Sequence, residues 1–179
     1  GVQTCALPIY RGHKVKAYPL QNYFQKFASS MPKQPVTLLA LDGFEKTETT
    51  EIFLANYVTI DSAPGREKEL PLYFSEDISH GMRVKQLELV IAGQDAVYFG
   101  LEISIPYLFE LVGMEKADSY CFVASDGYEI EIPDVAIPYG LIYPDEKSGY
   151  LRARFDGYDF AGAPGGGKVK YLLSIEAVK

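Results

Sequence analysis

The sequence contains no tryptophan, only two cysteines, and no apolar run long enough for a membrane-spanning helix. A spanning helix needs about 18 or more consecutive apolar residues, so we expect no transmembrane segment. Basic residues are also scarce, since 17 lysines and arginines stand against 24 acidic residues and give a net charge of −7. Nonspecific nucleic-acid binding depends on a basic surface that neutralises phosphates, so this balance argues against a nucleic-acid partner.

Residues 1–9 resemble the translation of a common short-read sequencing adapter, and the first residue is glycine rather than methionine. We expect these residues to be an assembly artefact and the native chain to continue upstream of Tyr10, so they carry no information on the fold. Cys5 then has no meaning, which leaves Cys121 as the one native cysteine of this stretch. One thiol forms neither an internal disulfide nor a metal cluster, so the redox compartment is left open.

What the sequence does contain is an internal duplication. Asp42-Gly43-Phe44 returns as Asp126-Gly127-Tyr128, and residues 81–87 return as residues 166–172. Paired positions lie 81 to 88 residues apart, and the spacing changes only across stretches rich in glycine, proline, serine or charge, which tolerate insertions. We therefore predict two similar repeats, residues 10–93 and 94–179, joined at residues 92–95.

Each repeat is predicted to be mostly β with one main helix packed on strands, which gives an α+β fold. Hydrophobic residues make up 47% of the chain, ample for such a core. The helix of repeat 1 follows Pro19, since apolar residues recur at helical spacing from Leu20 to Ala28, and the helix of repeat 2 runs from Pro106 to Gly113. A short capped helix is expected at 50–56, and strands at 36–40, 57–60, 70–74, 84–91, 120–125, 128–132, 141–143, 151–155 and 169–178.

Two motifs suggest chemistry but have simpler explanations. Residues 162–168 have the spacing of a phosphate-binding P-loop, but Val169 stands where a magnesium-binding hydroxyl belongs and a strand follows where a helix is needed, so we expect a flexible loop. The Asp42-Gly43 and Asp126-Gly127 pairs are interpreted as hairpin turns rather than catalytic carboxylates, because glycine readily takes the positive φ of a tight turn.

The remaining candidate residues are also assigned structural roles. Glu129 and Glu131 alternate with isoleucines, which places both on the solvent face of a strand rather than across a hydrolase cleft. Cys121 lies in an apolar strand and is expected to be a buried, inert thiol. His13 and His80 are expected in loops and do not have the spacing of metal ligands, so no metal site is predicted.

One polar feature recurs in both repeats, namely a valine with a cation on each side. Alternation along a strand puts both cations of such a pair on the face opposite the valine. The pairs are Arg83 with Lys85 and Lys168 with Lys170, and repeat 2 adds Arg152 and Arg154 on a further strand. If these strands are neighbours, the cluster can hold a phosphate or a carboxylate. The alternative is a solvated strand face in an otherwise acidic protein.

Repeat 2 resembles a known family over about 75 residues, and repeat 1 resembles it more faintly. The residues that carry the resemblance are Ser125-Asp126-Gly127-Tyr128, Leu151-Arg152, Phe155-Asp156-Gly157, Gly167-Lys168-Val169-Lys170-Tyr171-Leu172 and Ile175-Glu176. Together with the helix at 105–114 they resemble the second half of the sulfite-oxidase-like molybdopterin-binding domain. The resemblance implies a sulfite-oxidase-like fold.

The resemblance also implies a cofactor and a way to bind it. That family holds the phosphate of its pterin through basic residues, and the counterparts here are Arg152 and Lys168 or Lys170. Its molybdenum ligand is a cysteine in the earlier half of the domain. No cysteine lies between Tyr10 and Tyr120, and Cys121 is in a different strand, so neither a metal ligand nor a catalytic residue is assigned.

Two interpretations follow, and whether the chain is an enzyme is left open. In the first, it is a non-catalytic module of a bacterial protein, exported or associated with the cell envelope. This module binds a small anionic ligand or a protein partner. In the second, it is a fragment of a molybdopterin-dependent oxidoreductase whose cysteine-bearing part lies upstream. Fold alone does not decide between them, and we favour the first.

Overall fold

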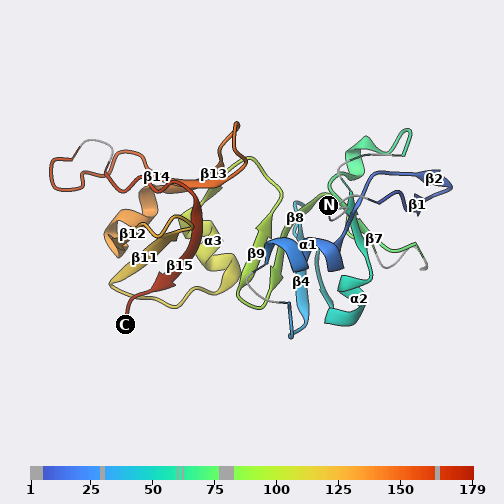
Figure 1. Cartoon of the computed structure of the whole chain (residues 1–179), viewed down its shortest axis with the longest axis horizontal. Helices are drawn as coiled ribbons and strands as arrows, with labels where there is room; N and C mark the ends of the chain where they lie inside the picture. The colour runs from blue at the N-terminus through green and yellow to red at the C-terminus, as the bar shows by residue number, and fades with distance from the viewer. Residues whose placement is uncertain (1–5, 29–30, 60, 62, 77–82, 164–165) are drawn as a thin grey trace. The chain divides into compact units, whose positions relative to one another are not determined.

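A computed structural model of the chain describes residues 6–28, 31–59, 61, 63–76, 83–163 and 166–179. The chain forms two compact units, which we call unit 1 (Gly1–Phe99) and unit 2 (Gly100–Lys179) (Figure 1). Both units are mostly β with few helices, which confirms the α+β class expected from the sequence.

Unit 1 contains two main antiparallel sheets. The larger has the strand order β5-β4-β8-β9 and the smaller has the order β3-β6-β7, while the short strands β1 and β2 pair with each other. The strands are β1 (Ile9–Tyr10), β2 (His13–Lys14), β3 (Tyr18–Pro19), β4 (Val36–Ala40), β5 (Glu45–Glu48), β6 (Tyr57–Thr59), β7 (Leu72–Phe74), β8 (Leu87–Ala92) and β9 (Asp95–Tyr98). The helices are α1 (Leu20–Phe27), α2 (Thr50–Leu54) and the 3₁₀ helix η1 (Glu67–Glu69).

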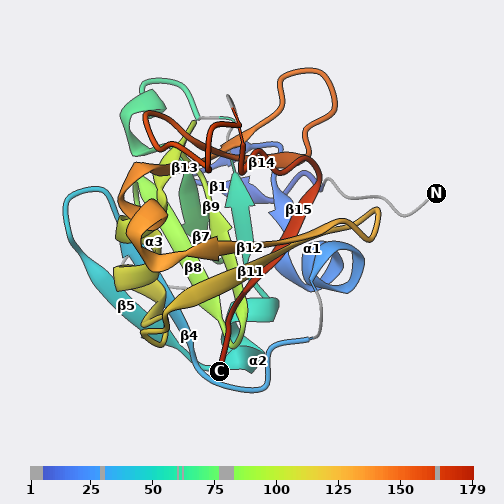
Figure 2. The same ribbon diagram turned by 90° about the vertical axis from the view of Figure 1, so that its left-hand side faces the viewer.

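Unit 2 also contains two antiparallel sheets, of orders β10-β13-β14 and β12-β11-β15, and Figure 2 shows β11 and β12 side by side as a hairpin. The strands are β10 (Ile103–Ser104), β11 (Ser119–Ala124), β12 (Glu129–Pro133), β13 (Gly140–Pro144), β14 (Leu151–Phe155) and β15 (Leu172–Ala177). The helices are α3 (Ile105–Val112), which begins and ends close to the predicted limits, and the 3₁₀ helix η3 (Asp134–Tyr139), which the sequence patterns did not predict.

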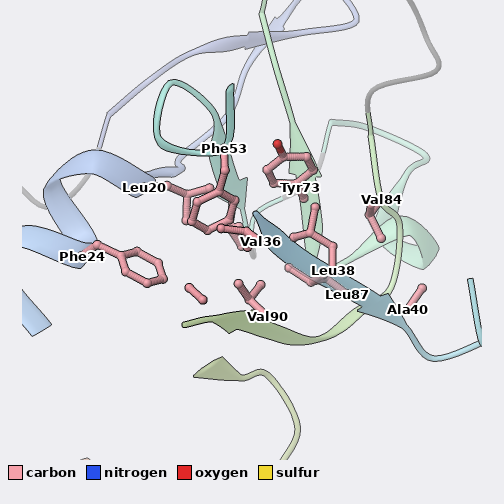
Figure 3. Packing of buried hydrophobic residues seen from close by; sticks show 12 residues of the cluster. Leu20, Phe24, Val36, Leu38, Ala40, Phe53, Tyr73, Val84, Leu87 and Val90 are labelled. Carbon is pink, nitrogen blue, oxygen red and sulfur yellow. The ribbon is translucent and has the colours of Figure 1, made fainter. Parts of the chain in front are cut away.

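The core of unit 1 forms where its two helices meet β4, β7 and β8 (Figure 3). Phe24 of α1 meets Phe53 of α2 edge to face, with ring centroids 5.3 Å apart, and Phe53 stacks on Tyr73 of β7 at 6.0 Å. The amphipathic pattern of residues 20–28 predicted a helix with one apolar face. That face of α1 packs Leu20 and Phe24 into this cluster.

The hairpin turns predicted at the two Asp-Gly pairs are present, between β4 and β5 and between β11 and β12. Gly43 and Gly127 have φ angles of 87° and 88°, a region that residues with a Cβ rarely adopt. The aspartate side chain of each turn accepts the backbone N–H two residues ahead, at 3.0 Å for Asp42 and 3.1 Å for Asp126. Both residues of each pair therefore have a structural role in the turn.

Two strands begin later than predicted. β8 starts at Leu87 rather than at residue 84, and β15 starts at Leu172 rather than at residue 169. The residues just before them, Gln86 and Tyr171, have φ angles of 49° and 56°. A left-handed residue interrupts the extended backbone. The alternation of apolar and polar residues nevertheless continues across this interruption, so the sequence predicts one longer strand in each case.

Residues 92–95, which were expected to join the two repeats, form the turn between β8 and β9. Gly93 takes a φ of 66° in this turn, and β9 pairs back onto β8. Unit 1 then continues to Phe99, whose N–H donates to the carbonyl of Glu88 at 2.9 Å. The added strand widens the larger sheet of unit 1 to four strands.

Replacing Gly127 by valine is expected to lower the free energy of unfolding by about 1–3 kcal/mol, because a β-branched residue is strained at this φ. Replacing it by asparagine should cost clearly less, since asparagine tolerates the left-handed region. Urea unfolding of the two variants makes the comparison at one position. Equal midpoints for the two variants would contradict the turn geometry.

Candidate anion-binding site

The two stretches of unit 2 that carry the predicted cations run side by side. Ala153 in β14 and Val169 form an antiparallel bridge in which each N–H donates to the other's carbonyl at 3.0 Å. Both side chains are 1% exposed and therefore face the core. Alternation places the residues that flank them on the opposite side of the sheet. We call this side the outer face of unit 2, and it carries Arg152, Arg154, Lys168 and Lys170.

Arg152 is held in place by a carboxylate from the loop after β13. Its Nη2 lies 2.7 Å from Asp145 Oδ2. Asp145 in turn accepts hydrogen bonds from the backbone N–H and the hydroxyl of Ser148, both at 2.9 Å. These bonds, and after them the charge of Arg152, lower the pKa of Asp145. The arginine is thus oriented while part of its five-donor fork stays free for other acceptors.

Arg154 is oriented by three contacts. Its Nε donates to Asp156 Oδ2 at 2.8 Å, and its Nη2 lies 3.7 Å from Glu102 Oε2. Its guanidinium carbon also lies over the ring of Tyr143, 4.8 Å from the ring centroid, as in a cation–π contact. Both arginines of the outer face are therefore positioned before any ligand arrives.

The two lysines of the outer face have a different environment. Lys168 and Lys170 are both exposed, and neither forms an ion pair with a carboxylate of the described residues. The bridge between Ala153 and Val169 places these lysines opposite the two arginines of β14. The outer face therefore combines two oriented guanidinium groups with two exposed lysines that have no carboxylate partner among the described residues.

The ring of Phe160 packs closely on the glycine-rich segment before Lys168. A Cβ on Gly167 would lie 2.5 Å from Phe160 Cζ, and a Cβ on Gly166 would lie 2.7 Å from Phe160 Cβ. Phe160 packs edge to face with Phe155 of β14, with centroids 5.6 Å apart. Gly166 and Gly167 lie in a turn, as expected of a loop, and an aromatic ring packs directly on their backbone. Residues 164–165 lie outside the described residues.

In unit 1 the corresponding cations surround a buried carboxylate. Glu69 is 6% exposed, and its Oε1 lies 2.9 Å from Lys85 Nζ and 3.1 Å from Arg66 Nη1. The phenol of Tyr10 donates to its Oε2 at 2.9 Å. Arg83 contacts this group indirectly, because its Nη1 donates to the Tyr10 oxygen at 3.4 Å. We call these residues, with Arg11, the Glu69 cluster.

The electrostatics of the Glu69 cluster favour the ionised carboxylate. Burial alone would raise the pKa of Glu69, but hydrogen bonds from Lys85, Tyr10 and Arg66 outweigh burial and lower it to about 2. Arg11 Nε donates a hydrogen bond to the Tyr10 hydroxyl oxygen at 3.2 Å, and this bond raises the pKa of the Arg11 guanidinium. At neutral pH the cluster therefore holds one negative charge among four cations.

Sequence patterns did not single out the partners of this cluster. Arg66 and Glu69 lie three residues apart in a charged segment that was interpreted as a loop, and this spacing was the one local signal available. Tyr10 lies 59 residues from Glu69, so no sequence pattern links them. Of the cluster, sequence analysis identified Arg83 and Lys85 because their alternation around a valine recurs in repeat 2.

The expectation of a buried thiol at Cys121 is wrong. Tyr120 and Phe122 of β11 point into the core, so the alternating Cys121 faces the other way and is half-buried. It pairs across the sheet with Glu131 and Glu176. Partial burial, and then the charges of the neighbouring glutamates, raise the pKa of the thiol. The solvent-facing position predicted for Glu129 and Glu131 is confirmed.

His13 lies in β2 rather than in a loop, and His80 is outside the described residues. In the described part of the chain, no three histidine, cysteine, aspartate or glutamate side chains gather to hold a metal ion. None of the described helices is long and apolar enough to cross a membrane. Compared with protein-family models, curated proteins and solved structures, the chain matches none.

Replacing Glu69 by glutamine is expected to lower the free energy of unfolding at neutral pH by about 1–3 kcal/mol, because a charged hydrogen-bond acceptor is lost from a buried site. The folded pKa of about 2 lies below the ordinary value of 4.5, so this stability is complete above about pH 4.5 and is lost as the pH falls toward 2. Urea unfolding of wild type and variant at pH 7 and pH 3 checks this.

The matched control is Glu67→Gln, which removes an exposed carboxylate two residues away. It should change stability little at either pH. If the difference in the free energy of unfolding between wild type and Glu69→Gln is the same at pH 7 and pH 3, the low pKa of Glu69 is contradicted.

Proposed function

We propose that the chain is a non-catalytic binding module that holds a small anion, or an anionic group of a protein partner, on the outer face of unit 2. The observation that carries the proposal is the bridge between Ala153 and Val169, because it turns four cations toward solvent on adjacent strands. Asp145, Asp156 and Glu102 pair with the two arginines, whereas Lys168 and Lys170 have no carboxylate partner among the described residues. The binding residues would be Arg152, Arg154, Lys168 and Lys170.

The chemistry of the outer face suits an oxyanion. Guanidinium groups present parallel N–H donors that match the oxygens of a carboxylate or a phosphate, and ammonium groups add compact charges. Like charges on neighbouring strands also destabilise a sheet when they lie opposite each other. A bound anion would neutralise the two lysines that lie opposite the paired arginines, so binding and stability should be coupled.

We also propose that the two units are copies of one sulfite-oxidase-like fold, in a bacterial protein that is exported or associated with the cell envelope. The strand orders β5-β4-β8 and β12-β11-β15 support a duplication, as do the orders β3-β6-β7 and β10-β13-β14. Among the described residues, each unit also has an Asp-Gly turn within a β-hairpin, an isolated bridge to a valine, and a left-handed residue before its long strand. Localisation and fold family rest on the sequence resemblance.

Sulfate or phosphate at millimolar concentration is expected to raise the unfolding temperature of the wild type more than chloride at equal ionic strength. Sulfate stabilises proteins generally by exclusion from their surface, so the decisive comparison is between variants. The variant Arg152→Gln with Lys168→Gln should gain less from sulfate than the wild type does. An equal gain would mean that the outer face is a solvated surface without an anion site.

The second candidate, a fragment of a molybdopterin oxidoreductase, needs a thiolate for its metal. In the described residues the candidate thiol is Cys121, and its surroundings do not fit this role. Cross-strand glutamates and partial burial raise its pKa and so disfavour the thiolate. No metal-dependent step is therefore assigned to the residues of this chain.

The purified protein is expected to contain no molybdenum after expression in a host that makes the cofactor. Without a thiolate ligand, a pterin would depend on its phosphate contacts alone and would be lost on dialysis. Elemental analysis of the dialysed protein makes the measurement. Molybdenum at near one atom per chain would overturn the non-catalytic proposal and favour the oxidoreductase.

A further inference from the structure

The Glu69 cluster and the outer face of unit 2 share one backbone geometry. In unit 1, Tyr73 and Val84 form an antiparallel bridge with both hydrogen bonds at 2.9 Å, and Lys85 follows Val84. In unit 2, Val169 bridges Ala153 in the same way, and Lys170 follows it. Lys85 and Lys170 therefore occupy the same position relative to their bridges.

In the described part of unit 2, no carboxylate pairs with Lys170 as Glu69 pairs with Lys85. Glu69 lies four residues before Tyr73, and the residue four before Ala153 is Gly149. Both segments pass close to the strand that follows the lysine, since Gln86 N–H donates to the Glu69 carbonyl at 2.8 Å and Tyr150 packs on Tyr171 with centroids 5.1 Å apart.

Gly149 leaves the position open in two respects. It has no side chain to offer, and a Cβ built on it would meet no atom within 4 Å. The exposed Lys170 consequently lacks the internal partner that neutralises Lys85. Lys168, which precedes the bridging valine as Arg83 does in unit 1, is also exposed and without a carboxylate partner among the described residues.

We propose that Lys168 and Lys170 bind a carboxylate group from outside the chain, in the role that Glu69 fills from within unit 1. This inference rests on the proposed anion-binding function and names its ligand class. Glu69 shows how such a contact is made, because it receives two cationic donors on one oxygen and a phenol on the other. A free dicarboxylate and an acidic peptide side chain share this chemistry.

Isothermal titration calorimetry tests the proposal with three probes, namely glutarate, an acetylated and amidated Glu-Glu dipeptide, and inorganic phosphate. Wild type should bind at least one of the two carboxylate probes with saturation. The double variant Lys168→Gln, Lys170→Gln should weaken that binding roughly tenfold or more, because two charged donors are lost. The control, Lys116→Gln with Lys179→Gln, removes two exposed lysines elsewhere in unit 2 and should bind as the wild type does.

Each outcome has a distinct meaning. Tighter binding of the dipeptide than of glutarate identifies a protein partner as the source, and the reverse identifies a free metabolite. Saturable binding of phosphate without either carboxylate overturns this inference and leaves the anion-binding function standing. If none of the three probes binds, both proposals fail. Carboxylate binding that the Lys168→Gln, Lys170→Gln variant retains in full also overturns the inference.

A reciprocal variant tests the same idea in unit 1. Glu69→Ala removes the internal carboxylate and leaves Lys85 and Arg66 around an open site. Formate should then raise the unfolding temperature of this variant more than that of the wild type, with chloride at equal ionic strength as the reference. Equal effects of formate on the two proteins would show that these cations do not recruit a carboxylate, against the inference.

Discussion

The two hydrogen bonds between Ala153 and Val169 determine which side chains unit 2 turns toward solvent. The side-chain period of a strand is two, so a shift of one residue would bring Lys168 or Lys170 into the core and expose Val169. Burial of an unpaired ammonium group costs far more than exposure of a valine. The register is therefore strongly specified, and the position of the outer-face cations is specified with it.

The same bridge geometry has a different result in unit 1, because the residues around it differ. The positions of Arg152 and Arg154 are taken there by Leu72 and Phe74, which are buried and pack with residues from the start of the chain. The ring of Tyr10, for example, lies 5.1 Å from that of Phe74. Unit 1 thus covers this side of its small sheet with its own chain and neutralises its cations internally.

The cations of the two units therefore have different environments. The Glu69 cluster ties η1, the segment before β8 and the N-terminal strand together through hydrogen bonds over long sequence distances. Its contribution is to stability. In unit 2 Asp145 and Asp156 orient the two arginines, and the two lysines beside them are exposed without a carboxylate partner among the described residues.

Local sequence patterns predicted the structure correctly where a single residue determines the backbone conformation. Gly43 and Gly127 predicted the two turns, and the alternation around Val169 predicted the shared face of the cations, because both depend on residues adjacent in sequence. Contacts between distant segments were not predictable in this way. Glu69 as the partner of Lys85, the outward position of Cys121 and the break at Tyr171 all depend on packing and on pairings that no local pattern encodes.

The most direct test of the central claim is an NMR titration of the protein with phosphate that follows the side-chain signals of its cations. The account predicts that the Nε–H signals of Arg152 and Arg154 and the Cε–H signals of Lys168 and Lys170 shift together along one saturable curve, while those of Lys116 and Lys179 do not. Small, non-saturating shifts spread evenly over all lysines and arginines would contradict it, because they would show a diffuse ion atmosphere and no site.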